Sequence, residues 1–287
     1  MRTLLVALAV VAFAAPVTAH AQAPSPAPAS APRDPKLPPS EDNAKAALDT
    51  SPRHGEFVDI AVPGDSVPLR AWVVYPERKG KAGAVLLIHE IYGLSDWLRG
   101  VADQLAAEGF IAVAPDLISG LGPGGGGTDS AASRDDVVKL VRALTPAMTS
   151  ARLDAARAYA ARIPAANGKV ATMGFCWGGG KSFAYAAAQP PPAAAVVFYG
   201  VAPDSEALTK VTAPVLAHYG SDDERVDATI EPARAALKKL GRSYETHIYE
   251  GAGHGFLRAQ ALRDGANLRA TQEAWPRTLA FLRKRLE

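Results

Sequence analysis

The sequence predicts an α/β fold, in which a mostly parallel central sheet is covered by helices on both faces. Two observations point to it: short apolar runs alternate with helical patterns from residue 55 onward, and several of these runs are almost uninterrupted. With 287 residues, 48% hydrophobic and 21% charged, the chain can bury the core of one large domain. The formal net charge of +2 gives no reason to expect nucleic acid or an anionic membrane as a partner.

The residues before position 55 are expected to lie outside this domain. Arg2, an apolar run over residues 4–15 and small residues before position 22 form the pattern of a secretory signal peptide over residues 1–21. The sequence therefore predicts an exported protein, periplasmic or secreted, without stable membrane association once the signal is removed, because the apolar run is too short to span a bilayer. Pro- and Ala-rich composition predicts a disordered linker over residues 22–54, and the folded domain is expected to span residues 55–287.

Strands are predicted from apolar patterning. The first two, residues 57–62 and 67–76, alternate or run apolar and are expected to pair antiparallel. The runs at 82–90 and 110–116 are continuous enough for strands buried on both faces. Further strands are predicted at residues 169–176, 193–200, 213–220 and 244–251.

Helical patterns fill the intervals between the strands. Ser95 is a suitable N-cap for a helix over residues 95–108, and Pro146 should break the long pattern over residues 135–163. The glycine-rich segment 119–130 is expected to be a mobile loop. Further helices are predicted at residues 177–189, 227–240 and 270–285. Since ligands of parallel sheets bind at the carboxyl ends of the strands, the chemistry is expected in the loops that follow them.

The stretch "MGFCWGGG", residues 173–180, contains the only cysteine of the chain. A predicted strand precedes Cys176 and a predicted helix follows it, so "GFCWG" has the form of a nucleophile elbow with cysteine in the central position. Glycines on both sides would let the backbone turn sharply, and the helix N-terminus would favour the thiolate. This pattern predicts that Cys176 is a nucleophile rather than a buried structural cysteine.

The rest of a catalytic triad is available in the expected chain order of nucleophile, acid and histidine. After the strand at 213–220 comes "SDDERV", where either Asp222 or Asp223 could be the acid. After the last strand, His254 stands between small residues on a loop and is the candidate base. The thiolate would attack a carbonyl carbon and form a thioester acyl-enzyme that water hydrolyses.

An oxyanion hole is expected from two backbone N–H groups. Trp177 directly follows the nucleophile, and Ile91 lies in the loop after the strand at 82–90. No cofactor motif or metal-ligand cluster is visible in the sequence. We therefore expect no cofactor and no metal.

Six pieces of the chain together resemble the dienelactone hydrolases (carboxymethylenebutenolidases), a branch of the α/β-hydrolase superfamily. They are "HEIYGL", "GFIAVAPDL", "GFCWGG", "FYGV", "GSDDERV" and "GAGHGF", in family order. The resemblance implies an α/β-hydrolase fold and a carboxylic-ester hydrolase that acts on ester or lactone bonds. It also implies that Asp223 is the acid and that Glu90 holds the resting thiol until substrate binds.

The resemblance further implies how the substrate is held. The family uses two arginines for a substrate carboxylate, and one of them matches Arg258. The other would lie in segment 119–130, which contains no arginine, so that Arg134 or another arginine would have to take its place. We therefore expect the hydrolase class to hold more firmly than dienelactone as the substrate. Tyr92 and Tyr199, together with Trp177, are candidates to line an apolar acyl pocket.

Two other classes of function compete with an esterase or lactonase. A non-catalytic ligand-binding protein on the same fold would bind without forming product, and a peroxide-reactive thiol protein would normally have a resolving cysteine, which the sequence lacks. The expected partner is a small-molecule ester or lactone, and the protein is expected to be a monomer.

Overall fold

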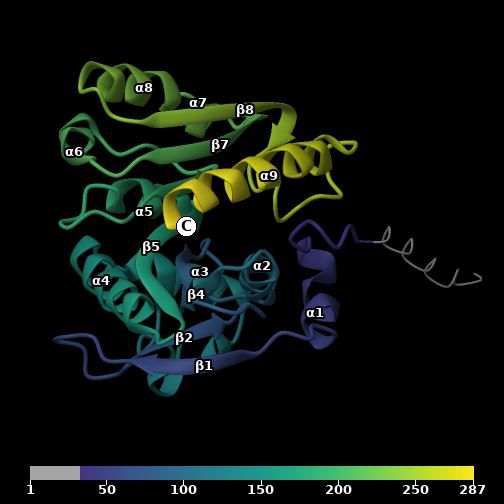
Figure 1. Ribbon diagram of the computed structural model, residues 1–287, viewed down its shortest axis with the longest axis vertical. Helices are drawn as coiled ribbons and strands as arrows, with labels where there is room; N and C mark the ends of the chain where they lie inside the picture. The colour runs from purple at the N-terminus through teal and green to yellow at the C-terminus, as the bar shows by residue number, and fades with distance from the viewer. Residues whose placement is uncertain (1–32) are drawn as a thin grey trace, which may run out of the picture. The chain divides into compact units, whose positions relative to one another are not determined.

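The computed structural model describes residues 33–287. Within them, eight strands form one sheet in the order β1-β2-β4-β3-β5-β6-β7-β8 (Figure 1). β1 (Gly55–Ile60) pairs antiparallel with β2 (Leu69–Val74), which pairs antiparallel with β4 (Ile111–Pro115). All further pairs are parallel. The mostly parallel sheet with antiparallel first strands is thus confirmed.

The remaining strands also lie where the apolar runs predict them. They are β3 (Ala82–Ile88), β5 (Ala166–Phe175), β6 (Ala195–Phe198), β7 (Val215–Asp222) and β8 (Tyr244–Gly253). Every residue of β3 and β4 is buried, because helices cover both faces of a parallel sheet.

The helices after β1 follow the predicted order, with two short additions. Ser95 caps α2 (Asp96–Ala107) by accepting from Leu98 N–H, and Pro146 begins α4 (Pro146–Arg162) just after α3 (Arg134–Ala143). These features confirm the predicted cap and break. The other long helices are α5 (Trp177–Tyr185), α8 (Ile230–Lys239) and α9 (Ala266–Leu286). The short helices α6 (Ser205–Lys210) and α7 (Glu224–Asp227) were not predicted.

The two faces of the sheet carry separate groups of helices. Side chains of α2 and α9 pack with one face of β3, β5 and β6. The opposite face packs against α3 and α4 near β3 and β4, and against α5, α6 and α8 near β6 and β7. The sheet is therefore covered on both sides, and its carboxyl edge is left for the loops that carry the candidate residues.

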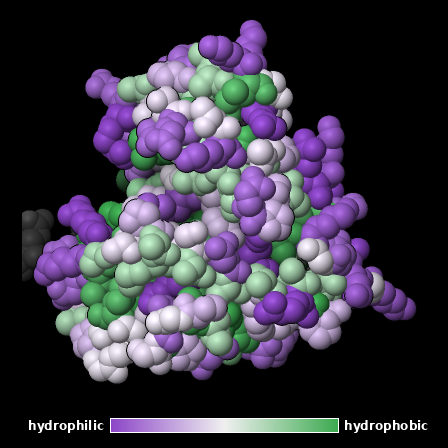
Figure 2. All heavy atoms as spheres, turned by 90° about the vertical axis from the view of Figure 1, so that its left-hand side faces the viewer, coloured by the Kyte–Doolittle hydropathy of each residue, from purple (hydrophilic) through white to green (hydrophobic). Residues whose placement is uncertain are grey.

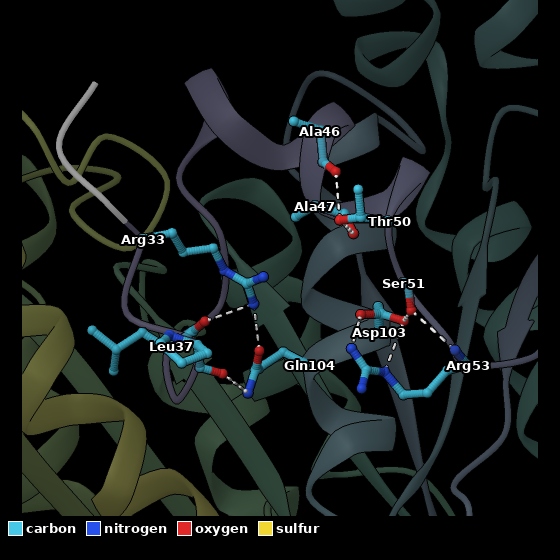
Figure 3. A network of polar contacts seen from close by, with 10 residues as sticks. Arg33, Leu37, Ala46, Ala47, Thr50, Ser51, Arg53, Asp103 and Gln104 are labelled. Atoms are coloured by element: carbon cyan, nitrogen blue, oxygen red, sulfur yellow. Dashed lines mark hydrogen bonds and ion pairs between the residues drawn. The ribbon is translucent and has the colours of Figure 1, made fainter. Parts of the chain in front are cut away.

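The linker prediction is wrong for the described residues before position 55. Here α1 (Glu41–Asp49) lies against α2, with Leu37 and Ala44 buried. Figure 3 shows how the flanking residues are held: Arg33 donates to the Gln104 side chain at 2.6 Å, and Arg53 forms an ion pair with buried Asp103 at 2.5 Å. These polar contacts explain why residues 33–54 are folded although they contain few apolar side chains. The predicted signal peptide and residues 22–32 lie outside the described residues.

The glycine-rich segment 119–130 has more fixed structure than the sequence indicates. It contains two 3₁₀ turns, Pro123–Gly125 and Thr128–Ser130. The Asp116 carboxylate accepts hydrogen bonds from the backbone and the hydroxyl of Thr128, at 2.6 and 2.8 Å, and the Thr128 hydroxyl accepts from Leu94 N–H. The segment is thereby tied to the loop that follows β3.

The surface mixes polar and apolar side chains on the face seen in Figure 2, where hydrophilic groups are interspersed with hydrophobic ones. Among residues 33–287, no helix has both the length and the apolar character needed to cross a bilayer.

Candidate active site

Cys176 lies at the turn between β5 and α5. Its backbone has φ +55° and ψ −116°, a left-handed conformation that costs a non-glycine residue of order 1–3 kcal/mol and is typical of functional turns. A Cβ on Gly178 would lie 2.2 Å from the Ile88 carbonyl oxygen, and one on Gly174 would lie 1.9 Å from the Gly178 carbonyl oxygen. The glycines are therefore required by close backbone approach, as the elbow pattern predicts.

His254 and Asp223 lie at the carboxyl ends of neighbouring strands. β7 and β8 are parallel neighbours, and His254 Nδ1 donates to Asp223 Oδ2 at 2.5 Å. Asp222 instead pairs with Arg263 on the outside of the domain. The sequence left open whether Asp222 or Asp223 is the acid. The structure pairs Asp223 with His254, and the Asp223 carboxylate is buried while that of Asp222 is half-exposed.

The electrostatics around His254 favour its protonated form. Partial burial opposes a charge on the imidazole, but the hydrogen bond with Asp223 and the neighbouring Cys176 sulfur outweigh it and raise the pKa of His254 to about 10. An imidazolium held between a carboxylate and a sulfur is the arrangement that supports a thiolate–imidazolium pair. Asp223 and Cys176 thus both adjoin His254.

Tyr199 lies beneath His254 rather than in an open pocket. Its side chain is fully buried, and its ring packs edge-on against those of His254 and Phe256, with centroids 5.2 and 5.4 Å apart. That Tyr199 contacts substrate stays a prediction. Its backbone has φ +41° directly after β6, and its ring packs against the imidazole of His254.

Glu90 is buried at the end of β3, and its partner differs from the expected one. Its Oε2 accepts from Arg258 Nε at 2.7 Å. Burial raises the pKa of Glu90, while Arg258 and His254 oppose that rise. Within residues 33–287 Glu90 makes no hydrogen bond to Cys176. Its carboxylate forms an ion pair with Arg258 in place of the expected contact with the thiol.

Arg258 and Arg134 meet at a second carboxylate. Arg258 Nη1 forms an ion pair with Glu41, and Arg134 Nη2 lies 2.9 Å from the other carboxylate oxygen of Glu41. The Tyr92 ring is contacted by both guanidinium groups, with Arg134 3.5 Å and Arg258 5.2 Å from its centroid. Sequence reasoning named both arginines and Tyr92 but missed Glu41, because it assigned residue 41 to a linker.

The candidate oxyanion donors have no competing partner. Among the described residues, the N–H groups of Ile91 and Trp177 donate no hydrogen bond. His89, which sequence reasoning did not single out, helps to fix this loop: its Nδ1 lies 2.7 Å from the Glu90 carbonyl, and its Nε2 accepts from Leu117 N–H. Burial lowers the pKa of His89, so the neutral ring can donate at one nitrogen and accept at the other.

Within residues 33–287 no group of three or more His, Cys, Asp and Glu side chains is placed to hold a metal ion.

Comparison with known proteins gives a consistent result. The model of the dienelactone hydrolase family matches residues 69–286. The carboxymethylenebutenolidase of Pseudomonas putida is 32% identical over 189 residues, covering 64% of this chain and 78% of the relative. The crystal structure of a dienelactone hydrolase from Anabaena variabilis shares 27% identity, with a TM-score of 0.58, covering 78% of this chain and 96% of that one.

A further solved structure matches the fold more closely at lower identity. It is a dienelactone hydrolase-like promiscuous phosphotriesterase from metagenomic libraries, with a TM-score of 0.67 and 23% identity, covering 82% of this chain and 99% of that one. The family match spans most of the domain, including β3, the elbow and the loops that carry Asp223 and His254. The chain therefore belongs to the dienelactone hydrolase family, with the α/β-hydrolase fold and the ester- or lactone-hydrolysing activity of that family.

Proposed function

We propose that this protein is an exported hydrolase of ester or lactone bonds that uses Cys176 as nucleophile, His254 as proton carrier and Asp223 as the group that orients the histidine. The observation that carries the proposal is the strained turn of Cys176 beside a histidine whose Nδ1 is bonded to a buried carboxylate at 2.5 Å. The N–H groups of Trp177 and Ile91 are the proposed oxyanion donors, each worth about 3 kcal/mol when well placed.

Acylation follows from this arrangement. The thiol proton moves to His254 Nε2, and the sulfur attacks the substrate carbonyl carbon, so that the carbonyl oxygen becomes an oxyanion. When the intermediate collapses, the ester C–O bond breaks and His254 returns the proton to the leaving oxygen. The products of this half-reaction are an alcohol and a thioester on Cys176; from a lactone, the alcohol stays attached to the acyl group.

Deacylation uses the same groups in reverse. His254 takes a proton from water, the hydroxide attacks the thioester carbonyl, and the C–S bond breaks to release the carboxylic acid. Cys176 and His254 return to their starting protonation. Asp223 keeps Nδ1 protonated throughout, so that Nε2 faces the sulfur and stabilises the imidazolium.

Export is the second part of the proposal, and its support is the signal-like pattern of residues 1–21. Fractionation of the native host tests it. Recovery of the protein outside the cytoplasm with a shortened N-terminus is the expected result, and an intact chain in the cytoplasm would contradict it.

The catalytic proposal is tested with Cys176→Ala and Cys176→Ser, assayed on a neutral aryl ester and on dienelactone. Both variants should fold, because the Cys176 side chain is partly exposed and a methyl or hydroxymethyl group fits the same turn. We expect Cys176→Ala to lose at least about 10³-fold in kcat/KM. Unchanged turnover would sink the proposal.

Two further outcomes would identify the competing functions. Tight ligand binding by the wild type without product would indicate a binding protein. Rapid loss of the thiol in dilute peroxide, with no ester turnover, would indicate a peroxide-reactive thiol protein.

A further inference from the structure

We propose that Glu41 is a specificity-determining residue, whose carboxylate occupies the anion site formed by Arg134 and Arg258 beside the catalytic centre and so disfavours carboxylate-bearing substrates. The inference rests on the proposed function, because it concerns the substrate class of the same site. It concerns a segment that precedes the part of the chain matched by the family model, which begins at residue 69.

The anion site is built from two guanidinium groups that converge on one carboxylate. Each oxygen of Glu41 faces a different arginine, Oε1 facing Arg134 and Oε2 facing Arg258. Tyr92 lies against both guanidinium groups. Two arginines around a single carboxylate give recognition by geometry as well as by charge.

This anion site adjoins the catalytic residues. Arg258 Nε donates to buried Glu90, which directly precedes the proposed oxyanion residue Ile91. A Cβ on Gly255, the neighbour of His254, would lie 3.4 Å from Arg258 Nη2. Arg258 therefore contacts the chain neighbours of both Ile91 and His254, which places the anion site at the edge of the catalytic centre.

Glu41 is held in place by the segment that carries it. Its backbone N–H donates to the Arg258 carbonyl at 2.9 Å, and Gln260 Nε2 donates to the Pro38 carbonyl at 3.0 Å. The indole N–H of Trp97 in α2 donates to the Pro39 carbonyl at 3.1 Å. With the anchors in Figure 3, these bonds fix residues 33–53 on α2 and on the loop after His254.

The charges then decide which substrates fit. With Glu41 in place, Arg258 faces two carboxylates and Arg134 faces one. An incoming substrate carboxylate must displace Glu41 from both arginines or approach it as a like charge, and either costs free energy. An uncharged ester or lactone meets no such penalty.

The test compares two aryl esters with the same leaving group, p-nitrophenyl butyrate and the p-nitrophenyl monoester of glutaric acid, which carries a carboxylate. The variant is Glu41→Gln, which keeps the shape and removes the charge, with Glu41→Ala as a second variant. The matched control is Asp42→Asn, one position along the same helix and exposed. Circular dichroism and thermal unfolding confirm that each variant is folded.

We expect Glu41→Gln to raise the ratio of kcat/KM for the anionic ester to that for the neutral ester about tenfold, mainly through KM. Adding Arg134→Ala should remove the gain, and Asp42→Asn should leave the ratio unchanged. An unchanged ratio in both Glu41 variants, or an equal rise in Asp42→Asn, would overturn the inference.

A binding measurement separates this inference from the proposed function. Calorimetry with glutarate should show about tenfold tighter binding to Glu41→Gln than to the wild type. Tighter glutarate binding by Glu41→Gln without Cys176-dependent turnover would support the role of Glu41 at the anion site and refute the thiol mechanism. Cys176-dependent turnover with unchanged glutarate binding and an unchanged ester ratio would refute the role of Glu41 and leave the mechanism standing.

Discussion

Asp223→Asn changes one atom of the proposed triad and removes the charge that holds His254. The asparagine amide would donate to Nδ1, where Asp223 Oδ2 accepts from it at 2.5 Å, so the imidazole would carry its proton on Nε2 and could not accept one from the thiol. Loss of the correct tautomer in a triad costs about 10⁴-fold in kcat with little change in geometry. We expect a loss of about 10³- to 10⁴-fold here.

The same substitution should move a measurable pKa. The hydrogen bond to Asp223 is the largest of the effects that raise the pKa of His254 to about 10. Without it the pKa should fall toward the ordinary histidine value of about 6.5. An NMR titration of the His254 ring, in the wild type and in Asp223→Asn, measures this directly, together with steady-state kinetics.

Asp222→Asn is the matched control, since Asp222 pairs with Arg263 and not with His254. It should keep nearly wild-type kcat and leave the titration of His254 unchanged. The reasoning would be refuted by equal losses in the two variants, or by an Asp223→Asn enzyme with full turnover and an unshifted His254.

Two further predictions concern the elbow and the pH dependence of stability. Gly178→Ala should lower the free energy of unfolding by about 1–3 kcal/mol, because its Cβ would lie 2.2 Å from a backbone oxygen. Gly180→Ala should lower it less, because the Cβ there would lie 3.2 Å from its nearest atom. Equal losses for the two variants in chemical unfolding would contradict the packing argument. Burial lowers the pKa of His218 well below 6.5. Below pH 6.5 the unfolded chain therefore binds a proton that the folded chain does not. As the pH falls, this group should lower the free energy of unfolding by up to about 1.4 kcal/mol per pH unit. His218→Gln should reduce that slope between pH 6.5 and 5, and an unchanged slope would show that His218 is not the group responsible.

The sheet and the elbow were predictable because each depends on local pattern. Continuous apolar runs at β3 and β4 require burial on both faces, and that requirement fixes a parallel sheet with covering helices. The glycines around Cys176 are needed wherever a strand turns at once into a helix, so their spacing carries the motif. Asp223 and His254 follow neighbouring parallel strands, so they lie at the same edge of the sheet.

The N-terminal helix was not predictable in this way. Residues 33–54 contain few large apolar side chains, and their attachment comes from specific pairs across the fold, such as Arg53 with Asp103. Sequence shows both residues but not that they meet. For the same reason the ion pairs of Glu41 with Arg134 and Arg258 could not be foreseen.

The side-chain contacts of the site were not predictable for a related reason. Tyr199 directly follows β6, and its buried ring packs against that of His254. Glu90 was expected to hold the thiol, yet Arg258 reaches it through a loop that begins after β8. Side-chain direction in loops depends on tertiary contacts that residue patterns do not encode.

The most direct test of the account is to trap the acyl-enzyme. The purified enzyme is mixed with a slowly hydrolysed aryl ester, quenched in acid, digested and analysed by mass spectrometry, with Cys176→Ala treated in parallel. The account predicts one acyl group per chain, attached to Cys176 as a hydroxylamine-labile thioester, and none on the variant. Rapid turnover with no adduct on Cys176, or the same adduct on another residue in both proteins, would contradict it.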